Sequence, residues 1–125
     1  MSEMKKITTT KAFPAAGPYT QAIALPSLIF VSGQIPGSPD GTIVSGSIAA
    51  CTAACCENVK AILAEAGSDI SKVVKTTVFL ADMKSFKEMN ETYEQYFAHR
   101  PARSCVAVRE LPKGVPVEIE CIALP

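Results

Sequence analysis

Hydrophobic and polar positions in the first third of the chain predict a β-hairpin followed by a loop. Residues 21–25 and 28–33 contain two short apolar runs, and Pro26 and Ser27 between them are typical of a turn. Residues 35–46 are rich in Gly, Pro, Ser and Asp and have no sustained period, which indicates a surface loop. We therefore expect two paired strands and then a connection along the surface.

The next segment has the apolar spacing of an amphipathic helix. Residues 47–66 place apolar side chains three or four positions apart, on one helix face: Ile48, Cys51, Cys55, Val59, Ile62 and Ala66. Gly67 follows directly and is typical of the end of a helix. The pattern therefore predicts a helix over residues 47–66.

A second helix is predicted over residues 85–98. Its apolar stripe consists of Phe86, Met89, Tyr93 and Phe97. Pro101 prevents the helix from continuing, because proline lacks the backbone N–H that a helix needs. Ser85 and Glu88 have the spacing of a capping box, so we expect them to cap the start of this helix.

The remaining apolar runs predict strands. Residues 73–80 are β-branched and aromatic with one charge, at Lys75, and the run is too short for a typical helix. We expect a largely buried strand there. Residues 104–109 and 115–124 are also extended runs, and the turn at residues 111–114 between them predicts a terminal β-hairpin.

The predicted order of elements is β-β-α-β-α-β-β, which places the chain in the α+β class. Helices can connect parallel strands while hairpins stay antiparallel, so we expect a mixed sheet with two helices on one face. Residues 1–125 have the usual size of one domain. The opposite face of the sheet would lack a cover, and we expect copies of the chain to associate through it.

Composition excludes some classes of function. The chain is 48% hydrophobic, yet none of its apolar runs approaches the roughly 18 to 20 residues of a membrane span. Lys plus Arg and Asp plus Glu are balanced at 12 each, so the molecule lacks the positive field that attracts nucleic acid. We expect neither a membrane nor a nucleic acid as partner.

The cysteines and the N-terminus predict a cytoplasmic location. The count of Cys is odd, at 5, and Cys55 and Cys56 are adjacent, which argues against a disulfide framework. The first residues contain no apolar stretch of signal-peptide length. Both features favour reduced thiols in the cytoplasm.

Metal sites and ordinary nucleophile sites are disfavoured by counting. His99 is the only histidine, so one chain can build neither a pair of histidines for zinc nor a two-histidine ribonuclease site. Cys105 and Cys121 have no histidine close in sequence to activate them. We expect all the cysteines to serve packing and predict no bound metal.

Some polar residues stand in apolar surroundings. Asn90 lies on the apolar face of the second helix, where its amide either ties a neighbouring loop or takes part in a site. Glu118 and Glu120 share one face of the last strand with apolar side chains, where exposure, an ion pair and catalysis are all open.

Arg103 is a further candidate for a functional site. It begins a strand that should pair with the strand of Glu118, so the two side chains are expected to lie close together. A guanidinium offers a planar fork for a substrate carboxylate, and a glutamate nearby could handle protons or a water molecule. An ordinary salt bridge is the alternative interpretation.

The sequence around these residues resembles the RidA (YjgF-type) family. The resemblance extends in order from Gly17 to Leu124. It is carried by Gly17-Pro18-Tyr19, Val31-Ser32-Gly33-Gln34-Ile35-Pro36, Asn90 with Tyr93, Pro101-Ala102-Arg103-Ser104-Cys105-Val106, Leu111-Pro112-Lys113-Gly114 and Val117-Glu118-Ile119-Glu120.

The resemblance implies a chorismate-mutase-like subunit in a homotrimer with active sites between subunits. It implies hydrolysis of 2-aminoacrylate and related 2-imino acids to 2-keto acids and ammonia without a cofactor. Arg103 would hold the substrate carboxylate, Glu118 would orient or activate the attacking water, and Tyr19 would close the pocket from the neighbouring chain. The implied lining residues are Ser32, Gly33, Asn90 and Cys105.

Other functions stay open at this point. A non-catalytic protein could use the same Arg103 pocket to bind a 2-keto acid as a regulatory ligand, and turnover alone would separate the two. Ribonuclease, translation-inhibitor and chaperone functions are also known for similar proteins. Residues 97–101 form a shorter segment than in some relatives, so the size of the pocket beside Arg103 is open.

Overall fold

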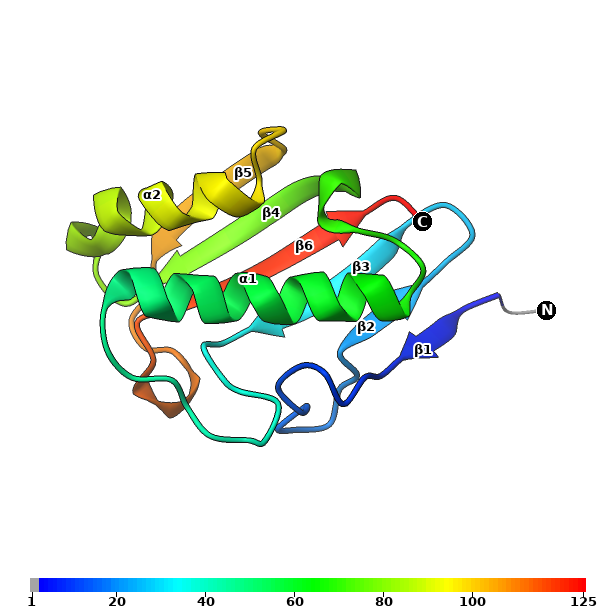
Figure 1. The fold of residues 1–125 in the computed structure, drawn as a ribbon, viewed down its shortest axis with the longest axis horizontal. Helices are drawn as coiled ribbons and strands as arrows, with labels where there is room; N and C mark the ends of the chain where they lie inside the picture. Colours follow the sequence, from blue (N-terminus) through cyan, green and yellow to red (C-terminus); the bar gives the residue numbers. More distant parts are fainter. Residues whose placement is uncertain (1–2) are drawn as a thin grey trace.

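The computed structural model describes residues 3–125, and its elements follow the predicted order with one strand added at the start (Figure 1). The strands are β1 (Lys5–Ile7), β2 (Ala22–Ala24), β3 (Ile29–Gln34), β4 (Val73–Leu80), β5 (Ala102–Ala107) and β6 (Val117–Ala123). The helices are α1 (Ile48–Glu65) and α2 (Phe86–Tyr96), with short 3-10 turns at Ile70–Lys72, Met83–Ser85 and Pro112–Gly114.

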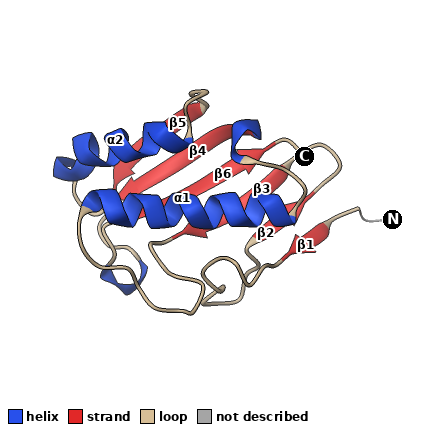
Figure 2. Ribbon diagram, in the orientation of Figure 1, coloured by secondary structure: helices blue, strands red, loops and turns tan. Residues whose placement is uncertain are grey.

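The strands form one mixed sheet in the order β1-β2-β3-β6-β4-β5. Strands β4 and β5 are parallel, and the other neighbours are antiparallel. Both helices cover the same face of the sheet (Figure 2). The α+β class, the mixed sheet, the first hairpin and both helices are therefore confirmed. Strand β1 was not predicted, because a three-residue segment with two lysines has no strand pattern.

The predicted terminal hairpin is wrong. Strand β4 lies between β5 and β6, so these two strands are not neighbours. Helix α2 carries the chain across to a parallel position at the edge, as a β-α-β connection requires. Strand β6 then pairs with β3 and β4. It is the better interior strand, because four of its seven side chains are buried, whereas none of those of β5 is.

The core lies between the sheet and helix α1. The predicted helix face is confirmed, since Cys55, Val59 and Ile62 are fully buried against sheet residues that include Val78 and Ile119. The first turn of α1 is capped by Ser47, whose Oγ accepts a hydrogen bond of 3.0 Å from the N–H of Ala50. These contacts fix α1 across the sheet.

The predicted capping box at the start of α2 is also wrong. Ser85 has helical dihedrals, φ −81° and ψ −4°, because a 3-10 turn precedes α2, and its side chain makes no capping hydrogen bond. A capping serine needs an extended backbone instead. Glu88 turns toward the other helix and accepts from the N–H of Ala49 at 3.4 Å.

The second face of the sheet is uncovered by any element within residues 3–125 (Figure 1). Side chains alternate along a strand, so the residues between the buried ones point to this face. Phe30 and Val106 do so and are 41% and 45% exposed.

None of the helices in residues 3–125 has the length and apolar character needed to cross a membrane.

Candidate functional site

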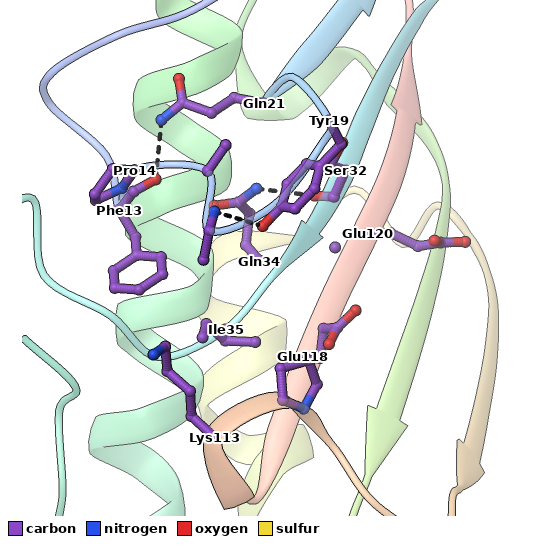
Figure 3. A pocket seen from close by; sticks show the side chains of 14 residues that line it. Phe13, Pro14, Tyr19, Gln21, Ser32, Gln34, Ile35, Lys113, Glu118 and Glu120 are labelled. Atoms are coloured by element: carbon purple, nitrogen blue, oxygen red, sulfur yellow. Dashed lines mark hydrogen bonds between the residues drawn. The ribbon is translucent and has the colours of Figure 1, made fainter. Parts of the chain in front are cut away.

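Four of the predicted site residues line one cavity of about 460 Å³: Tyr19, Ser32, Gly33 and Glu118. Figure 3 shows this cavity between the loop that precedes β2, the end of β3 and the side chains of β6. Glu120 and Lys113 stand at its border. The structure therefore brings together predicted residues from distant parts of the sequence.

The carboxyl group of Glu118 lies directly over Gly33. A Cβ atom on Gly33 would be only 2.0 Å from Oε2 of Glu118, so the absence of a side chain at this position makes room for the carboxylate. Glu118 is half-buried, and this burial raises its pKa above the ordinary value of 4.5, with repulsion from Glu120 adding to the effect. Such a carboxyl group can take and return a proton near the reacting atoms.

The loop with Tyr19 is held by local hydrogen bonds. The hydroxyl of Tyr19 accepts a hydrogen bond of 3.2 Å from the N–H of Ala16. The backbone N–H of Tyr19 donates to the carbonyl of Gly17 at 2.8 Å. The side chain is 47% exposed at the mouth of the cavity. Ser32 donates through Oγ to the carbonyl of Thr20 at 2.6 Å, which joins the loop to β3.

Two buried amides fix the wall of this cavity. Gln21 donates from Nε2 to the carbonyls of Thr9 and Phe13, at 3.2 and 2.9 Å. Asn58 of α1 accepts from the N–H of Phe13 at 3.1 Å and donates to the carbonyls of Ile35 and Gly37. The sequence analysis missed both roles. Asn58 lies three positions after Cys55 on the buried helix face, which is the signal that identified Asn90.

Arg103 lies elsewhere, in a second concavity of about 320 Å³ that Asn90 also lines. Its Nη1 donates a hydrogen bond of 2.7 Å to Oδ1 of Asn90, and its guanidinium carbon stands 4.8 Å from the centre of the Tyr93 ring. The amide of Asn90 thus bonds to Arg103 of strand β5 and not to a neighbouring loop. The amide and the aromatic ring together hold the guanidinium beside α2.

The expected proximity of Arg103 and Glu118 within one chain is wrong. Arg103 pairs with Thr76 of β4 and points toward the helices, whereas Glu118 pairs with Phe79 and points to the open face. The ordinary salt bridge between them is excluded for the same reason. The error follows from the terminal hairpin, because the interposed β4 separates the two strands.

The thiol groups have the properties of packing residues. All five cysteines are free, and only Cys105 is partly exposed. Burial raises the pKa of the Cys105 thiol, although Arg103 partly opposes this shift, and burial raises that of Cys121 to about 12. These thiols are therefore protonated at neutral pH and are poor nucleophiles.

The remaining metal-ligand types are scattered. In residues 3–125, His, Cys, Asp and Glu form no group of three or more that could hold a metal ion. The ring of His99 bonds through Nε2 to the carbonyl oxygen of Val73 at 2.9 Å. His99 thus lies beside the start of β4 and lines neither cavity.

Comparison with known proteins identifies relatives over nearly the whole chain. The family described as endoribonuclease L-PSP matches residues 9–125. The chain is 46% identical to the mitochondrial protein MMF1 of Saccharomyces cerevisiae, over 99% of this chain and 86% of that protein. It is 45% identical to the 2-iminobutanoate/2-iminopropanoate deaminase of Escherichia coli K12, over 96% and 97% of the two chains.

Solved structures agree with the sequence relatives. A crystal structure of TdcF from E. coli with bound serine superimposes with a TM-score of 0.93 at 42% identity, covering 97% of this chain and 98% of that one. A crystal structure of the yeast protein YEO7 gives a TM-score of 0.95 at 44% identity, covering 97% and 98%. The chain therefore belongs to the endoribonuclease L-PSP family, which confirms the RidA (YjgF-type) resemblance of its motifs.

Proposed function

We propose that this protein is a deaminase that hydrolyses 2-imino acids, and the enamines from which they form, to 2-keto acids and ammonia. The observation that carries the proposal is the half-buried carboxyl of Glu118 over Gly33, in a cavity that Tyr19 and Ser32 also line. The name of the E. coli relative, 2-iminobutanoate/2-iminopropanoate deaminase, supports the same chemistry.

The proposed chemistry needs positioning and proton transfer. An imine carbon is already electrophilic, so Glu118 takes a proton from a water molecule as the water oxygen bonds to that carbon. That proton passes from Glu118 to the imine nitrogen, which gives a carbinolamine. The hydroxyl proton of the carbinolamine then moves to the nitrogen as the C–N bond breaks, so that a 2-keto acid and ammonia leave. Arg103 holds the substrate carboxylate with its planar fork. No cofactor is needed in this scheme.

We propose that the complete site forms between copies of the chain. Tyr19, Ser32, Gly33 and Glu118 supply one half, and Arg103, Asn90 and Cys105 supply the other half from a neighbouring subunit. Because the two halves occupy different patches, their contact is head-to-tail, which gives a ring when the rotation between neighbouring subunits closes. The family resemblance gives three subunits. The uncovered sheet face, with Phe30 and Val106 exposed, supports this association.

Two alternatives predict other behaviour. A binding protein for 2-keto acids needs the Arg103 clamp but has no use for the proton transfer of Glu118. A ribonuclease is suggested by the description of the family. The balanced charge and the single histidine give no support for RNA cleavage.

Five free cysteines favour a reducing compartment, and we propose a cytoplasmic location.

The decisive experiment is a coupled assay. A pyridoxal-phosphate enzyme generates 2-aminoacrylate from serine, and pyruvate release is followed with and without this protein, after subtraction of the spontaneous rate. Glu118→Gln should lower turnover by about 10² to 10⁴ while it leaves pyruvate binding in place. Glu91→Gln, at an exposed position of α2, is the matched control. Near wild-type turnover of Glu118→Gln would contradict the catalytic role of Glu118, whereas no acceleration of pyruvate release by the unchanged protein would support the binding-protein alternative.

Mixing of inactive variants tests the shared site. Arg103→Ala and Glu118→Gln are each expected to be inactive, but in mixed rings some interfaces combine two intact halves. Random reassembly of equal amounts should restore about a quarter of wild-type turnover. Light scattering should give about 40 kDa, three times the chain mass of 13.2 kDa. A stable monomer, or no recovery after proven subunit exchange, would contradict the shared site.

A further inference from the structure

Arg103 rests on an aromatic surface of helix α2. Its guanidinium carbon is 4.8 Å from the centre of the Tyr93 ring and 5.5 Å from that of Phe86. Both distances are within the range of a cation–π contact. Asn90 of the same helix accepts one hydrogen bond from Nη1, at 2.7 Å. Residues of one helix therefore hold the guanidinium, because two aromatic rings lie within cation–π distance of it and Asn90 bonds to its Nη1.

The Tyr93 ring is itself fixed by a buried hydrogen bond. Its hydroxyl lies 2.6 Å from Oγ1 of Thr76, a residue of β4 that is fully buried. The ring also stacks on Phe97, with centres 4.5 Å apart and an interplanar angle of 28°. Thr76 is the register partner of Arg103 across β4 and β5. The strand pairing and the hydroxyl bond therefore set the position of the ring relative to the arginine.

The remaining donors of Arg103 are available for a ligand. A guanidinium has five N–H donors, and within residues 3–125 only the bond to Asn90 is made. Burial raises the pKa of Tyr93, so its ring is a neutral phenol at working pH and the contact with Arg103 is cation–π in character. The guanidinium of Arg103 is therefore held in place, while most of its N–H donors make no hydrogen bond to the described residues.

We infer that Tyr93 is a positioning residue whose hydroxyl bond to Thr76 sets the aromatic surface that orients Arg103 toward the substrate carboxylate. This inference rests on the proposed role of Arg103. A long arginine side chain has many rotamers, and a guanidinium oriented before binding loses less entropy when it takes a carboxylate. Tyr93 acts on substrate affinity, and Glu118 acts on the chemical step.

The test uses Tyr93→Phe, Thr76→Val and the double variant in the assembled protein. Pyruvate binding is measured by calorimetry, kcat and KM by the coupled assay, and stability by thermal unfolding. Each single change should raise both the Kd of pyruvate and KM by about 3- to 10-fold, with kcat within about twofold of wild type. Tyr93→Leu removes the ring and should raise both by about 10- to 30-fold.

The double variant separates positioning from structural support. Each single variant leaves one buried hydroxyl without its partner and should lower the melting temperature, whereas the double variant leaves none and should recover stability. Under our inference, affinity stays weak in the double variant because the bond that orients the ring is still absent. Recovery of KM together with stability would overturn the positioning role.

Two controls complete the design. Tyr96→Phe removes the other hydroxyl bond of α2, to Glu57 at 2.7 Å, and does not touch Arg103, so KM should not change. Arg103→Ala tests the proposed function itself and should weaken pyruvate binding more than any Tyr93 variant. If Arg103→Ala weakens binding but the Tyr93 and Thr76 variants do not, this inference alone fails. If Arg103→Ala has no effect on pyruvate binding, both the proposed role of Arg103 and the positioning role of Tyr93 fail.

Discussion

The carboxyl group of Glu118 occupies the space above Gly33 that a side chain at residue 33 would need, with 2.0 Å between Oε2 and the position of a Cβ atom. Strands β3 and β6 are neighbours in the sheet, so this contact is set by their pairing. The atom in conflict is the end of a flexible side chain, so the strands can stay in place while the carboxylate moves.

Gly33→Ala should therefore damage activity more than stability. The new methyl group displaces the carboxylate of Glu118 from its position in the cavity, and misplacement of a catalytic group by about 1 Å costs about 10²-fold in rate. The coupled assay and thermal unfolding measure the two effects. Ser45→Ala, at an exposed loop position, is the control for an added or removed small group. Full activity of Gly33→Ala would show that the carboxylate need not lie there.

The acid limb of the activity profile should report Glu118. In the proposed mechanism the carboxylate form takes the proton from water, so kcat/KM should fall as pH decreases through the pKa of Glu118, which burial raises above 4.5. Repulsion from Glu120 also raises this pKa. Glu120→Gln should therefore shift the acid limb to lower pH, and added salt should reduce the shift. An unchanged limb at low salt would assign the titration to another group.

The same carboxyl group should lower stability at neutral pH. Because its folded-state pKa is raised, the folded protein binds the proton more tightly than the unfolded chain, and stability falls as pH rises through that interval. Glu118→Gln should raise the melting temperature at pH 7, and this gain should disappear below about pH 4. Glu91→Gln, at an exposed position, is the control for loss of a carboxylate. A pH-independent gain would point to packing instead.

Local patterns predicted most of the elements, and pairing between distant strands caused the error in the terminal hairpin. The strand at residues 73–80 and both helices follow from periods of apolar residues, which report burial directly. The period of a strand contains no information about its neighbour in the sheet. The apolar period therefore could not place β6 between β3 and β4. For the same reason it could not predict that Arg103 and Glu118 lie apart within one chain.

The candidate site was predictable to different degrees. Asn90 and Glu118 stood out because they are polar residues among apolar ones, and each lines one of the two cavities. Tyr19 and Gly33 came only from the family resemblance. The need for glycine at residue 33 becomes visible only when Glu118 is seen above it, and the exposed Tyr19 has no local pattern that marks it.

Cys105 should be dispensable for turnover. Its thiol has a raised pKa and lines neither cavity of the isolated chain, and we expect Cys105 to contact the substrate through backbone groups and not through sulfur. Cys105→Ser should retain at least about half of wild-type kcat, and alkylation by iodoacetamide at pH 7 should be slow, as for a protonated thiol. A loss as large as that of Arg103→Ala, in a folded and assembled protein, would instead indicate thiol chemistry.

Two buried polar residues of α1 should respond in opposite directions. Thr52 is fully buried, and its Oγ1 has no hydrogen-bond partner in residues 3–125. A buried hydroxyl without a partner is costly, and valine has the same shape. Thr52→Val should therefore raise the free energy of unfolding by about 0.5–1 kcal/mol and leave kcat unchanged. It serves as the matched control for Asn58 on the same helix.

Asn58→Ala should be strongly destabilising and should also lower activity. The change removes three hydrogen bonds, to the N–H of Phe13 and the carbonyls of Ile35 and Gly37. Backbone groups left unpaired in a buried place cost about 1–3 kcal/mol each before relaxation, so we expect a total loss of about 2–4 kcal/mol. Phe13 and Ile35 line the cavity of Glu118, so their release should raise KM as well. Denaturant unfolding and the coupled assay measure both effects. Loss of stability without any change in KM would mean that Asn58 supports the fold but not the site.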